Sequence, residues 1–319
     1  MPDTVHTPER PSYRSRLVYA AAWVAGRSVL RMLPLDERGM HAAQRIDPLA
    51  GRAPRPRYAD TRPVSFGEFD GEWVRGHRAT GEGVVLYFHG GGFFFCGLNT
   101  HRRCAARISA GSGMPVLNVA YRQLPVTDLH GSITDCLTAY RWLLDQGYRA
   151  DRIVFAGDSA GGYLSVATAL RAREAGLAVP AGIVAMSALF EIDSTARLLH
   201  ANTRSETYIP IRHLPTLSRW WSGDGELAAG DRRPALSPVD ADLTGLPPTL
   251  LVAAESEVLR LDSELMAQRL AEAGVPCTLH LWRGQIHAFP VLGHMLPESK
   301  AALTEVTRFV RETVDAGRH

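Results

Sequence analysis

The stretch Gly-Asp-Ser-Ala-Gly at 157–161 separates two segments of different hydrophobic pattern. Residues 152–156 form an apolar run typical of a β-strand, and residues 161–167 form a run typical of a helix. A Gly-x-Ser-x-Gly sequence between a strand and a helix is typical of a nucleophilic serine, because the sharp turn exposes the hydroxyl at the end of the strand. The flanking glycines avoid collisions that a Cβ would cause. The sequence therefore predicts that Ser159 is a nucleophile, although so short a pattern needs a second signal.

The second signal is the run His-Gly-Gly-Gly at 89–92, which follows a strand-like segment at 84–88. Glycines let main-chain N–H groups approach a ligand closely. Acyl transfer needs such donors where negative charge develops on the carbonyl oxygen. We expect Gly91, Gly92 and Ala160 to supply them as an oxyanion hole. A phosphate-binding loop is the weaker alternative, because neither a following Lys-Ser/Thr nor a G-x-G-x-x-G spacing occurs.

A serine hydroxyl needs a base to remove its proton, and a histidine is expected in this role. His287 has the most suitable setting of the twelve histidines, because it follows a strand-like run at 277–282 and a turn at 283–285. Loops at strand ends carry the chemistry of α/β sheets. We expect His280 to be an ordinary strand residue and His89 to brace the glycine loop. The sequence thus predicts that His287 is the base.

The carboxylate that orients this histidine is expected on the loop after a strand-like run at 249–253, which carries three acids. Asp262 precedes a helical pattern and is most simply explained as a helix N-cap. Glu255 lies directly at the strand end. Glu257 lies two residues further along and 30 residues before His287. We favour Glu257, with Asp262 and Glu255 as alternatives.

His-Gly-Gly-Gly at 89–92 and Gly-Asp-Ser-Ala-Gly-Gly at 157–162 together resemble the motifs of the hormone-sensitive-lipase family of α/β-hydrolase esterases. The similarity extends from about residue 60 to the C-terminus and includes Gly-Gln-Ile-His at 284–287. It implies an α/β-hydrolase fold and a serine hydrolase with a Ser-His-acid triad. The family more often has Asp as the acid, so Glu257 is a departure, but either carboxylate can orient an imidazole. We expect neither a metal nor an organic cofactor, since this chemistry needs none.

The composition is compatible with this class of enzyme. A chain of 319 residues, 45% of them hydrophobic, can bury one large core. The net charge of +2 predicts no strongly charged partner, and scattered arginines do not form a nucleic-acid groove. Four widely spaced cysteines without a Cys-x-x-Cys pair fit neither a zinc site nor a dense disulfide framework, which favours a cytoplasmic protein. A homo-oligomer is left open.

Strand-like and helix-like patterns alternate along most of the chain, which predicts a mainly parallel sheet covered by helices on both faces. We expect strands near 84–88, 115–120, 152–156, 182–186, 249–253 and 277–282, and helices near 101–110, 132–146, 161–175, 262–273 and 299–315.

The N-terminal residues 1–60 are expected to form a helical cap and linker that precede a catalytic domain at 61–319. We predict an amphipathic helix over the active site at 14–33, and an extended connection at 48–63, where four prolines occur. The apolar run at 17–26 imitates a secretory signal, but ten apolar residues are too few to span a bilayer. A signal or membrane-surface segment at 14–33 is the alternative.

A second covering segment, about 189–235, is expected to form a lid over the catalytic edge of the sheet. We expect its Tyr208, together with Phe93 and Phe94, to line an apolar substrate pocket; core packing is the alternative for these aromatics. Such a pocket favours short- to medium-chain acyl esters, and so a serine carboxylesterase. A deacetylase of N- or O-acetylated small metabolites, acyl transfer to another alcohol and a non-catalytic ligand-binding protein on the same fold are the alternatives.

Overall fold

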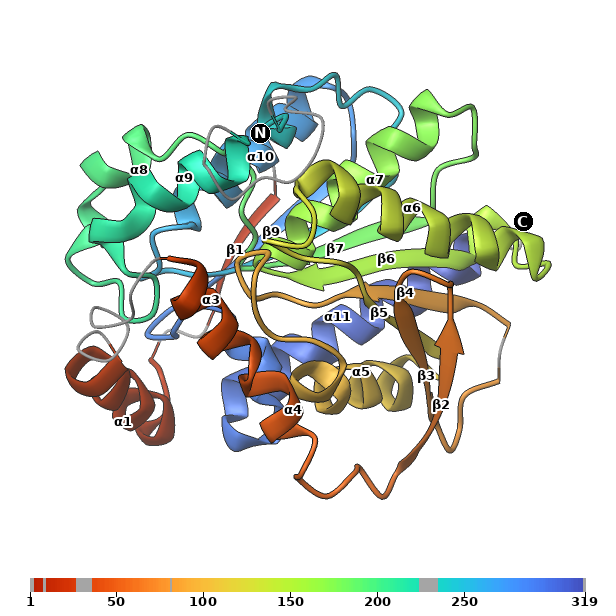
Figure 1. Ribbon diagram of the computed structural model, residues 1–319, viewed down its shortest axis with the longest axis horizontal. Coiled ribbons are helices and arrows are strands. Elements are labelled where there is room, and N and C mark those ends of the chain that lie inside the picture. Colours follow the sequence, from red (N-terminus) through yellow and green to blue (C-terminus); the bar gives the residue numbers. More distant parts are fainter. Residues whose placement is uncertain (1–2, 8–9, 27–35, 81, 224–234, 318–319) are drawn as a thin grey trace.

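A nine-stranded sheet forms the centre of the described part of the chain in the computed structural model (Figure 1). The structure describes residues 3–7, 10–26, 36–80, 82–223 and 235–317. The strand order is β1-β9-β8-β7-β6-β4-β5-β3-β2. The strands are β1 Asp3–Thr7, β2 Ala59–Ser65, β3 Asp70–Gly76, β4 Val84–Phe88, β5 Val116–Ala120, β6 Ile153–Asp158, β7 Gly182–Met186, β8 Thr249–Ala254 and β9 Cys277–Trp282.

The sheet is mainly parallel, as the sequence predicts. Among the described strands the antiparallel pairs are β2–β3 and β3–β5, so β3 runs opposite to the other strands. The six predicted strands are confirmed within two residues at each end. The sequence did not predict β1, β2 or β3, which lie toward the two ends of the strand order.

Helices cover both faces of the sheet (Figure 1). Side chains from β4 alternate between two hydrophobic clusters: one includes residues of α6, α7 and α10, and the other includes residues of α5 and α11. This alternation follows from the period of a strand, in which successive side chains point to opposite faces. The helices are α1 Tyr13–Ala21, α3 Glu37–Gln44, α4 Ile46–Ala50, α5 Leu98–Ser112, α6 Leu129–Asp145, α7 Ala160–Glu174, α8 Thr195–Leu199, α9 Leu214–Ser222, α10 Arg260–Glu272 and α11 Pro297–Ala316.

The described part of the helix predicted at 14–33 is helical. The α-helix α1 is followed directly by a π-helix, Ala22–Gly26, and residues 27–33 lie outside the described residues. The Ser15 hydroxyl donates to Glu298 over 2.6 Å, which ties α1 to the first turn of α11. The expected extended connection at 48–63 is only partly correct, because α4 and β2 occupy its two ends.

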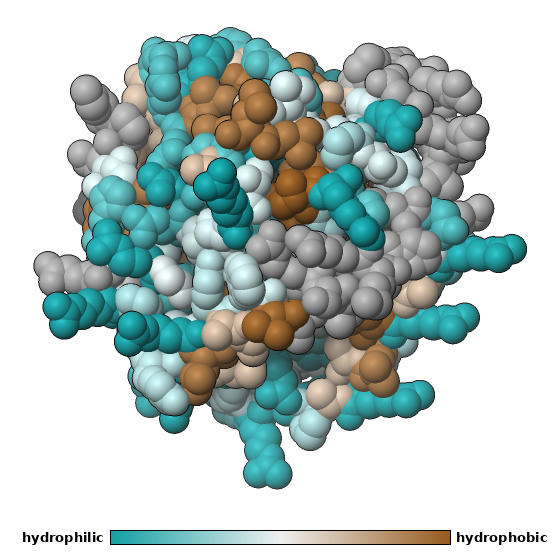
Figure 2. All heavy atoms as spheres, turned by 90° about the vertical axis from the view of Figure 1, so that its left-hand side faces the viewer, coloured by the Kyte–Doolittle hydropathy of each residue, from teal (hydrophilic) through white to brown (hydrophobic). Residues whose placement is uncertain are grey.

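Two segments lie at the carboxyl ends of the parallel strands. The first segment comes from the N-terminal part of the chain and contains α3 and α4. The second is the connection between β7 and β8 and contains α8 and α9 (Figure 1). Residues 224–234 of that connection lie outside the described residues. Figure 2 shows this side of the molecule, where hydrophobic side chains gather between hydrophilic ones. None of the helices in the described ranges combines the length and apolar character that a membrane span needs.

Candidate active site

Ser159 occupies the turn between β6 and α7 and has a φ of +51°, a backbone conformation that non-glycine residues rarely adopt. Its N–H donates to the carbonyl oxygen of Met186 over 2.8 Å, which ties the turn to the end of β7. A Cβ at Gly161 would collide with the carbonyl oxygen of Phe88, and one at Gly157 would collide with that of Gly161. The two glycines therefore allow the close approach of β4, β6 and α7 that holds the serine in place.

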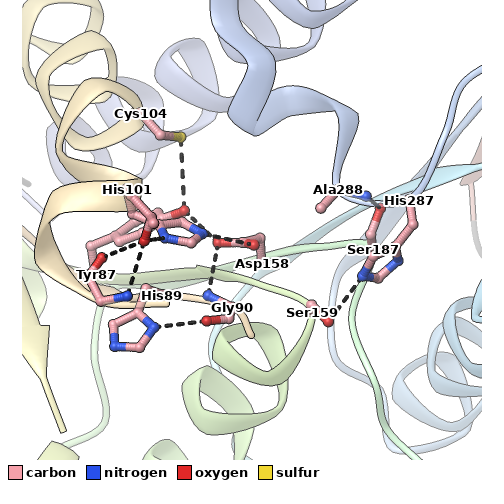
Figure 3. A network of polar contacts seen from close by, with 12 residues as sticks. Tyr87, His89, Gly90, His101, Cys104, Asp158, Ser159, Ser187, His287 and Ala288 are labelled. Carbon is pink, nitrogen blue, oxygen red and sulfur yellow. Dashed lines mark hydrogen bonds and ion pairs between the residues drawn. The ribbon is translucent and has the colours of Figure 1, made fainter. Parts of the chain in front are cut away.

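A chain of short hydrogen bonds connects Ser159, His287 and Glu257. The distance from Ser159 Oγ to His287 Nε2 is 3.0 Å (Figure 3), and that from His287 Nδ1 to Glu257 Oε2 is 2.6 Å. The other oxygen of Glu257 accepts the N–H of Ala254 over 2.8 Å. Both partners of the histidine pair are buried, so solvent does not compete for these bonds. The structure thus brings together the three residues that the sequence singled out.

Burial and charge shape the titration of this pair. Burial alone would lower the pKa of His287, but the hydrogen bond and the negative charge of Glu257 outweigh it, so the pKa of His287 is raised. Burial raises the pKa of Glu257, although its hydrogen bond to His287 works in the opposite direction. The histidine is consequently a stronger base than a free imidazole, and it becomes protonated at a higher pH.

The two alternative acids have other partners. Asp262 is not the predicted N-cap: Leu259 occupies that position, and Asp262 lies in the first turn of α10. It forms a fully buried ion pair with Arg197 of α8 over 2.8 Å, and so attaches the connection between β7 and β8 to α10. Glu255 pairs instead with Arg283 over 3.1 Å.

The glycine loop presents unused donors beside the serine. Gly91 and Gly92 have φ values of +119° and +59°, and both line the same cavity as Ser159 and Ala160. No hydrogen bond among the described residues uses the N–H of these two glycines or of Ala160. The Gly91 carbonyl accepts the N–H groups of Phe94 and Phe95, each over 3.1 Å, which fixes the orientation of the loop.

A buried polar network lies behind this loop (Figure 3). The Asp158 carboxylate accepts hydrogen bonds from Tyr87 over 2.7 Å, from the Gly90 N–H over 3.2 Å and from His101 over 3.3 Å. Burial raises the pKa of Asp158, but His101, the Tyr87 hydrogen bond and His89 together outweigh it, so this pKa is lowered. The negative charge of Asp158 in turn raises the pKa of His101 against the effect of that residue's own burial. Asp158 therefore connects the serine turn to the start of the glycine loop.

His89 supports the other side of the loop, as expected, and makes no hydrogen bond to the serine hydroxyl within the described residues. Its ring stacks on Tyr121 with centroids 4.4 Å apart, and the Tyr121 hydroxyl donates to the His89 carbonyl over 2.7 Å. Burial and the neighbouring His101 lower the pKa of His89 to about 4, so its ring is neutral at ordinary pH. His280 is a buried residue of β9, as expected for a strand residue.

A cavity of about 350 Å³ opens above Ser159 and is lined mainly by apolar side chains. Phe93, Phe94 and Tyr208 all lie in its wall, as predicted, although Phe93 is also fully buried in the core. The Tyr208 ring stacks on His287 with centroids 5.6 Å apart. Residues of α3 and α9 and Ile46 of α4 complete the wall, whereas α1 contributes none. Among the described N-terminal residues the cover over the site therefore comes from α3 and α4, and residues 27–33 of the predicted helix lie outside the described residues.

The insertion between β7 and β8 also holds the site together. The Asn202 side chain donates to the carbonyl oxygens of Glu255 and Glu257, each over 2.8 Å, and Glu206 accepts the N–H of Val258 over 2.8 Å. From α9, the indole N–H of Trp221 donates to the Gly92 carbonyl over 3.0 Å. These contacts join the insertion both to the acid loop and to the glycine loop, and no local sequence pattern predicts them.

Ser187 is a further residue of the site that sequence reasoning missed. It has a φ of +49°, and its hydroxyl accepts the N–H of Ala288 over 3.0 Å, which holds the loop after His287 (Figure 3). Among the described residues, no group of three or more His, Cys, Asp or Glu side chains is placed to hold a metal ion.

Comparisons with known proteins agree with this geometry. A family model described as the alpha/beta hydrolase fold matches residues 85–291. The chain is 39% identical over 231 residues to "Esterase LipU" of Mycobacterium tuberculosis, covering 72% of this chain and 77% of that protein. It is 32% identical over 255 residues to an "Acetyl-hydrolase" of Streptomyces hygroscopicus, covering 80% and 83%.

A crystal structure described as an esterase from the bacterial hormone-sensitive lipase family superimposes with a TM-score of 0.84 at 28% identity, covering 96% of this chain and 99% of the other. Fold and site thus define an α/β-hydrolase. The chain belongs to the hormone-sensitive-lipase family of these enzymes. The predicted fold, family and class of enzyme, a carboxylic ester hydrolase, are confirmed.

Proposed function

We propose that this protein is a serine carboxylesterase that hydrolyses short- to medium-chain acyl esters through an acyl-enzyme on Ser159. The observation that carries the proposal is the buried chain of hydrogen bonds from Glu257 through His287 to the serine hydroxyl, at the floor of an apolar cavity. A hydroxyl is a weak nucleophile until a base takes its proton, and only this arrangement supplies the base in the right position.

In the first half of the reaction, His287 Nε2 accepts the proton of Ser159 as its Oγ attacks the ester carbonyl. Glu257 stabilises the imidazolium that forms and fixes its tautomer, because its carboxylate accepts the Nδ1 proton. The free N–H groups of Gly91, Gly92 and Ala160 stabilise the oxyanion. One such donor contributes about 2.7–4 kcal/mol to transition-state stabilisation. His287 then protonates the alcohol, which leaves.

In the second half, water replaces the alcohol. The water oxygen attacks the acyl carbonyl while His287 accepts one of the water protons. His287 then gives a proton to Ser159 Oγ when the acyl–serine bond breaks. The carboxylic acid is released, and the free hydroxyl is restored. The same groups thus serve both halves of the cycle, and no step requires a cofactor.

The size of the cavity supports the proposed acyl-chain length. A cavity of about 150 Å³ holds one benzene molecule, so the volume of about 350 Å³ above Ser159 has room for roughly a dozen carbon atoms, shared between acyl and alcohol parts. The wall carries few polar groups beyond the catalytic ones, which favours uncharged substrates. We propose that the N-terminal segment 1–60 and the insertion at 189–235 cover a catalytic domain at 61–319, and that the protein acts in the cytoplasm.

Two measurements test the proposal. A series of p-nitrophenyl esters from acetate to palmitate should give the highest kcat/KM between C2 and about C8, because longer chains exceed the cavity. A fluorophosphonate should label the protein once, and peptide mapping should place the label on Ser159. Labelling at another residue would overturn the assignment of the nucleophile. A kcat/KM that still rises at C16 would overturn the chain-length limit.

Deacetylation of an acetylated small metabolite is the second candidate, favoured by the similarity to the acetyl-hydrolase of Streptomyces hygroscopicus. The same acyl-enzyme chemistry would serve. Higher kcat/KM for acetylated amines or sugars than for p-nitrophenyl butyrate would select this candidate.

A further inference from the structure

A second cavity, of about 360 Å³, lies between α5, the start of α11 and the 3-10 helix η6, Phe289–Met295. It shares no lining residue with the cavity above Ser159. η6 separates the two, because its Val291 and Leu292 line the active site while its Gly293 and His294 line the second cavity. We call this second cavity the basic cleft. Its polar lining residues are Tyr58, Arg107, His294, Lys300, Thr304 and Thr307.

The charge of the basic cleft is not compensated. Arg107 and Lys300 both line it, Lys300 is the only lysine of the chain, and no Asp or Glu belongs to its wall. Neither cation takes part in an ion pair within the described residues, whereas Arg102 on the same helix pairs with Glu72 over 2.6 Å. Lys300 also lies in the first turn of α11, where the helix dipole disfavours a cation and favours an anion. Two positive charges therefore face one concave surface without a counter-charge.

The guanidinium of Arg107 is held in a fixed position. It lies over the Tyr58 ring, with 5.8 Å between its carbon and the ring centroid, and it packs against Gly293, where a Cβ would collide with Arg107 Nε. Its Nη1 atom is buried and has no hydrogen-bond partner among the described residues. Arg107 thus lines the basic cleft in a fixed orientation, and its charge is not committed to an ion pair within the described residues.

We propose that the basic cleft binds a small molecule through a phosphate group. An arginine fork and a lysine ammonium are the side chains that bind phosphoryl oxygens most strongly, and their charge of +2 balances a phosphate monoester of about −1.5 to −2. Tyr58 also lines the basic cleft, and its side chain carries a hydroxyl that can donate a hydrogen bond. The volume is in the range of about 300–1,000 Å³ typical of small-molecule sites, and exceeds what phosphate alone would fill. The ligand is therefore expected to carry an organic part.

Inorganic phosphate serves as the probe. Its binding to the full-length protein is followed by calorimetry and by ³¹P line width, with ionic strength held constant by sodium chloride. We expect saturable binding that persists after a fluorophosphonate has blocked Ser159, because the basic cleft does not share the active-site cavity. Acetate at the same ionic strength should bind more weakly. Loss of phosphate binding after Ser159 has been blocked, or tighter binding of acetate than of phosphate, would overturn the proposal.

Two variants locate the site. Arg107→Gln and Lys300→Gln should each weaken phosphate binding by about tenfold or more, as loss of one charge-assisted hydrogen bond implies. Arg141→Gln is the control, since it removes the same charge from an exposed position on α6, across the sheet, and should change the affinity less than twofold. Lys300 is exposed, so its variant tests the site even if Arg107→Gln unfolds the protein. No saturable binding below about 50 mM, or undiminished binding by Lys300→Gln, would overturn the proposal.

Discussion

Replacement of Glu257 by Gln tests the pair that activates the serine. In the wild type, one oxygen of Glu257 accepts the Ala254 N–H and the other accepts the His287 Nδ1 proton. A glutamine that keeps the bond to Ala254 places its NH₂ group against His287 Nδ1. The imidazole proton must then move to Nε2, which can no longer accept the proton of Ser159. We expect kcat to fall by about 10³–10⁴, the loss that a wrong tautomer causes in comparable triads.

The pH profile of the same variant gives a second, independent readout. Ester hydrolysis needs neutral His287, so activity is lost as the pH falls through its pKa, which Glu257 raises. Without the carboxylate, the pKa of His287 falls, because the hydrogen bond and the negative charge that raise it are lost. The acid limb of kcat/KM should therefore lie at lower pH in the variant than in the wild type.

The assay is p-nitrophenyl butyrate hydrolysis from pH 4.5 to 9, with Glu255→Gln as the control. Glu255 pairs with Arg283 at the surface, so its variant should keep its rate within about twofold and its acid limb unchanged. Circular dichroism checks that both variants fold. A Glu257→Gln variant that retains more than a tenth of the wild-type kcat, or that keeps the wild-type acid limb, would contradict the role of Glu257 in orienting His287 and raising its pKa.

Three further outcomes are expected. Trp221→Phe keeps an aromatic ring in the pocket but loses the hydrogen bond to the Gly92 carbonyl, so kcat for p-nitrophenyl butyrate should fall by roughly 2- to 12-fold. An unchanged kcat would show that this hydrogen bond does not position the glycine loop. Asp158→Asn removes the negative charge that raises the pKa of His101, so the pKa of His101, followed by NMR, should fall. An unchanged pKa of His101 would contradict its ion pair with Asp158. Arg197→Met leaves the buried Asp262 without its counter-charge, although the N–H groups of Phe190 and Glu191 still donate to it. The free energy of unfolding in urea should fall by about 3–5 kcal/mol, and a variant as stable as the wild type would show the pair to be dispensable.

The sequence predicted the part of the sheet that is buried on both faces. Strands such as β4 and β6 are entirely buried, so their sequences are continuous apolar runs with clear ends. β2 lies at the edge of the sheet and contains Asp, Arg and Pro, which hide its extended conformation. β1 is also an edge strand with several polar residues, and its partner, β9, is separated from it by nearly the whole sequence. Such edge strands depend on long-range pairing that a local pattern does not encode.

The site shows the same division. The serine turn and the glycine loop are local motifs, and each could be predicted because its glycines answer a local steric need. The acid could not be selected from local spacing alone, since three carboxylates lie on one loop. The choice of acid depends on a contact between the loops that follow β8 and β9. The local pattern predicts Asp262 as an N-cap, because its actual partner, Arg197, lies 65 residues away and leaves no local signal. The bonds from Asn202 to the acid loop are long-range in the same way.

The most direct test of the whole account is the turnover of p-nitrophenyl butyrate by purified Ser159→Ala. Loss of the Oγ nucleophile should reduce kcat by at least about 10³, while the circular dichroism spectrum and the melting temperature stay close to those of the wild type. A folded variant that still hydrolyses the ester at a rate near the wild type would mean that the bond is broken elsewhere on the protein or by another mechanism.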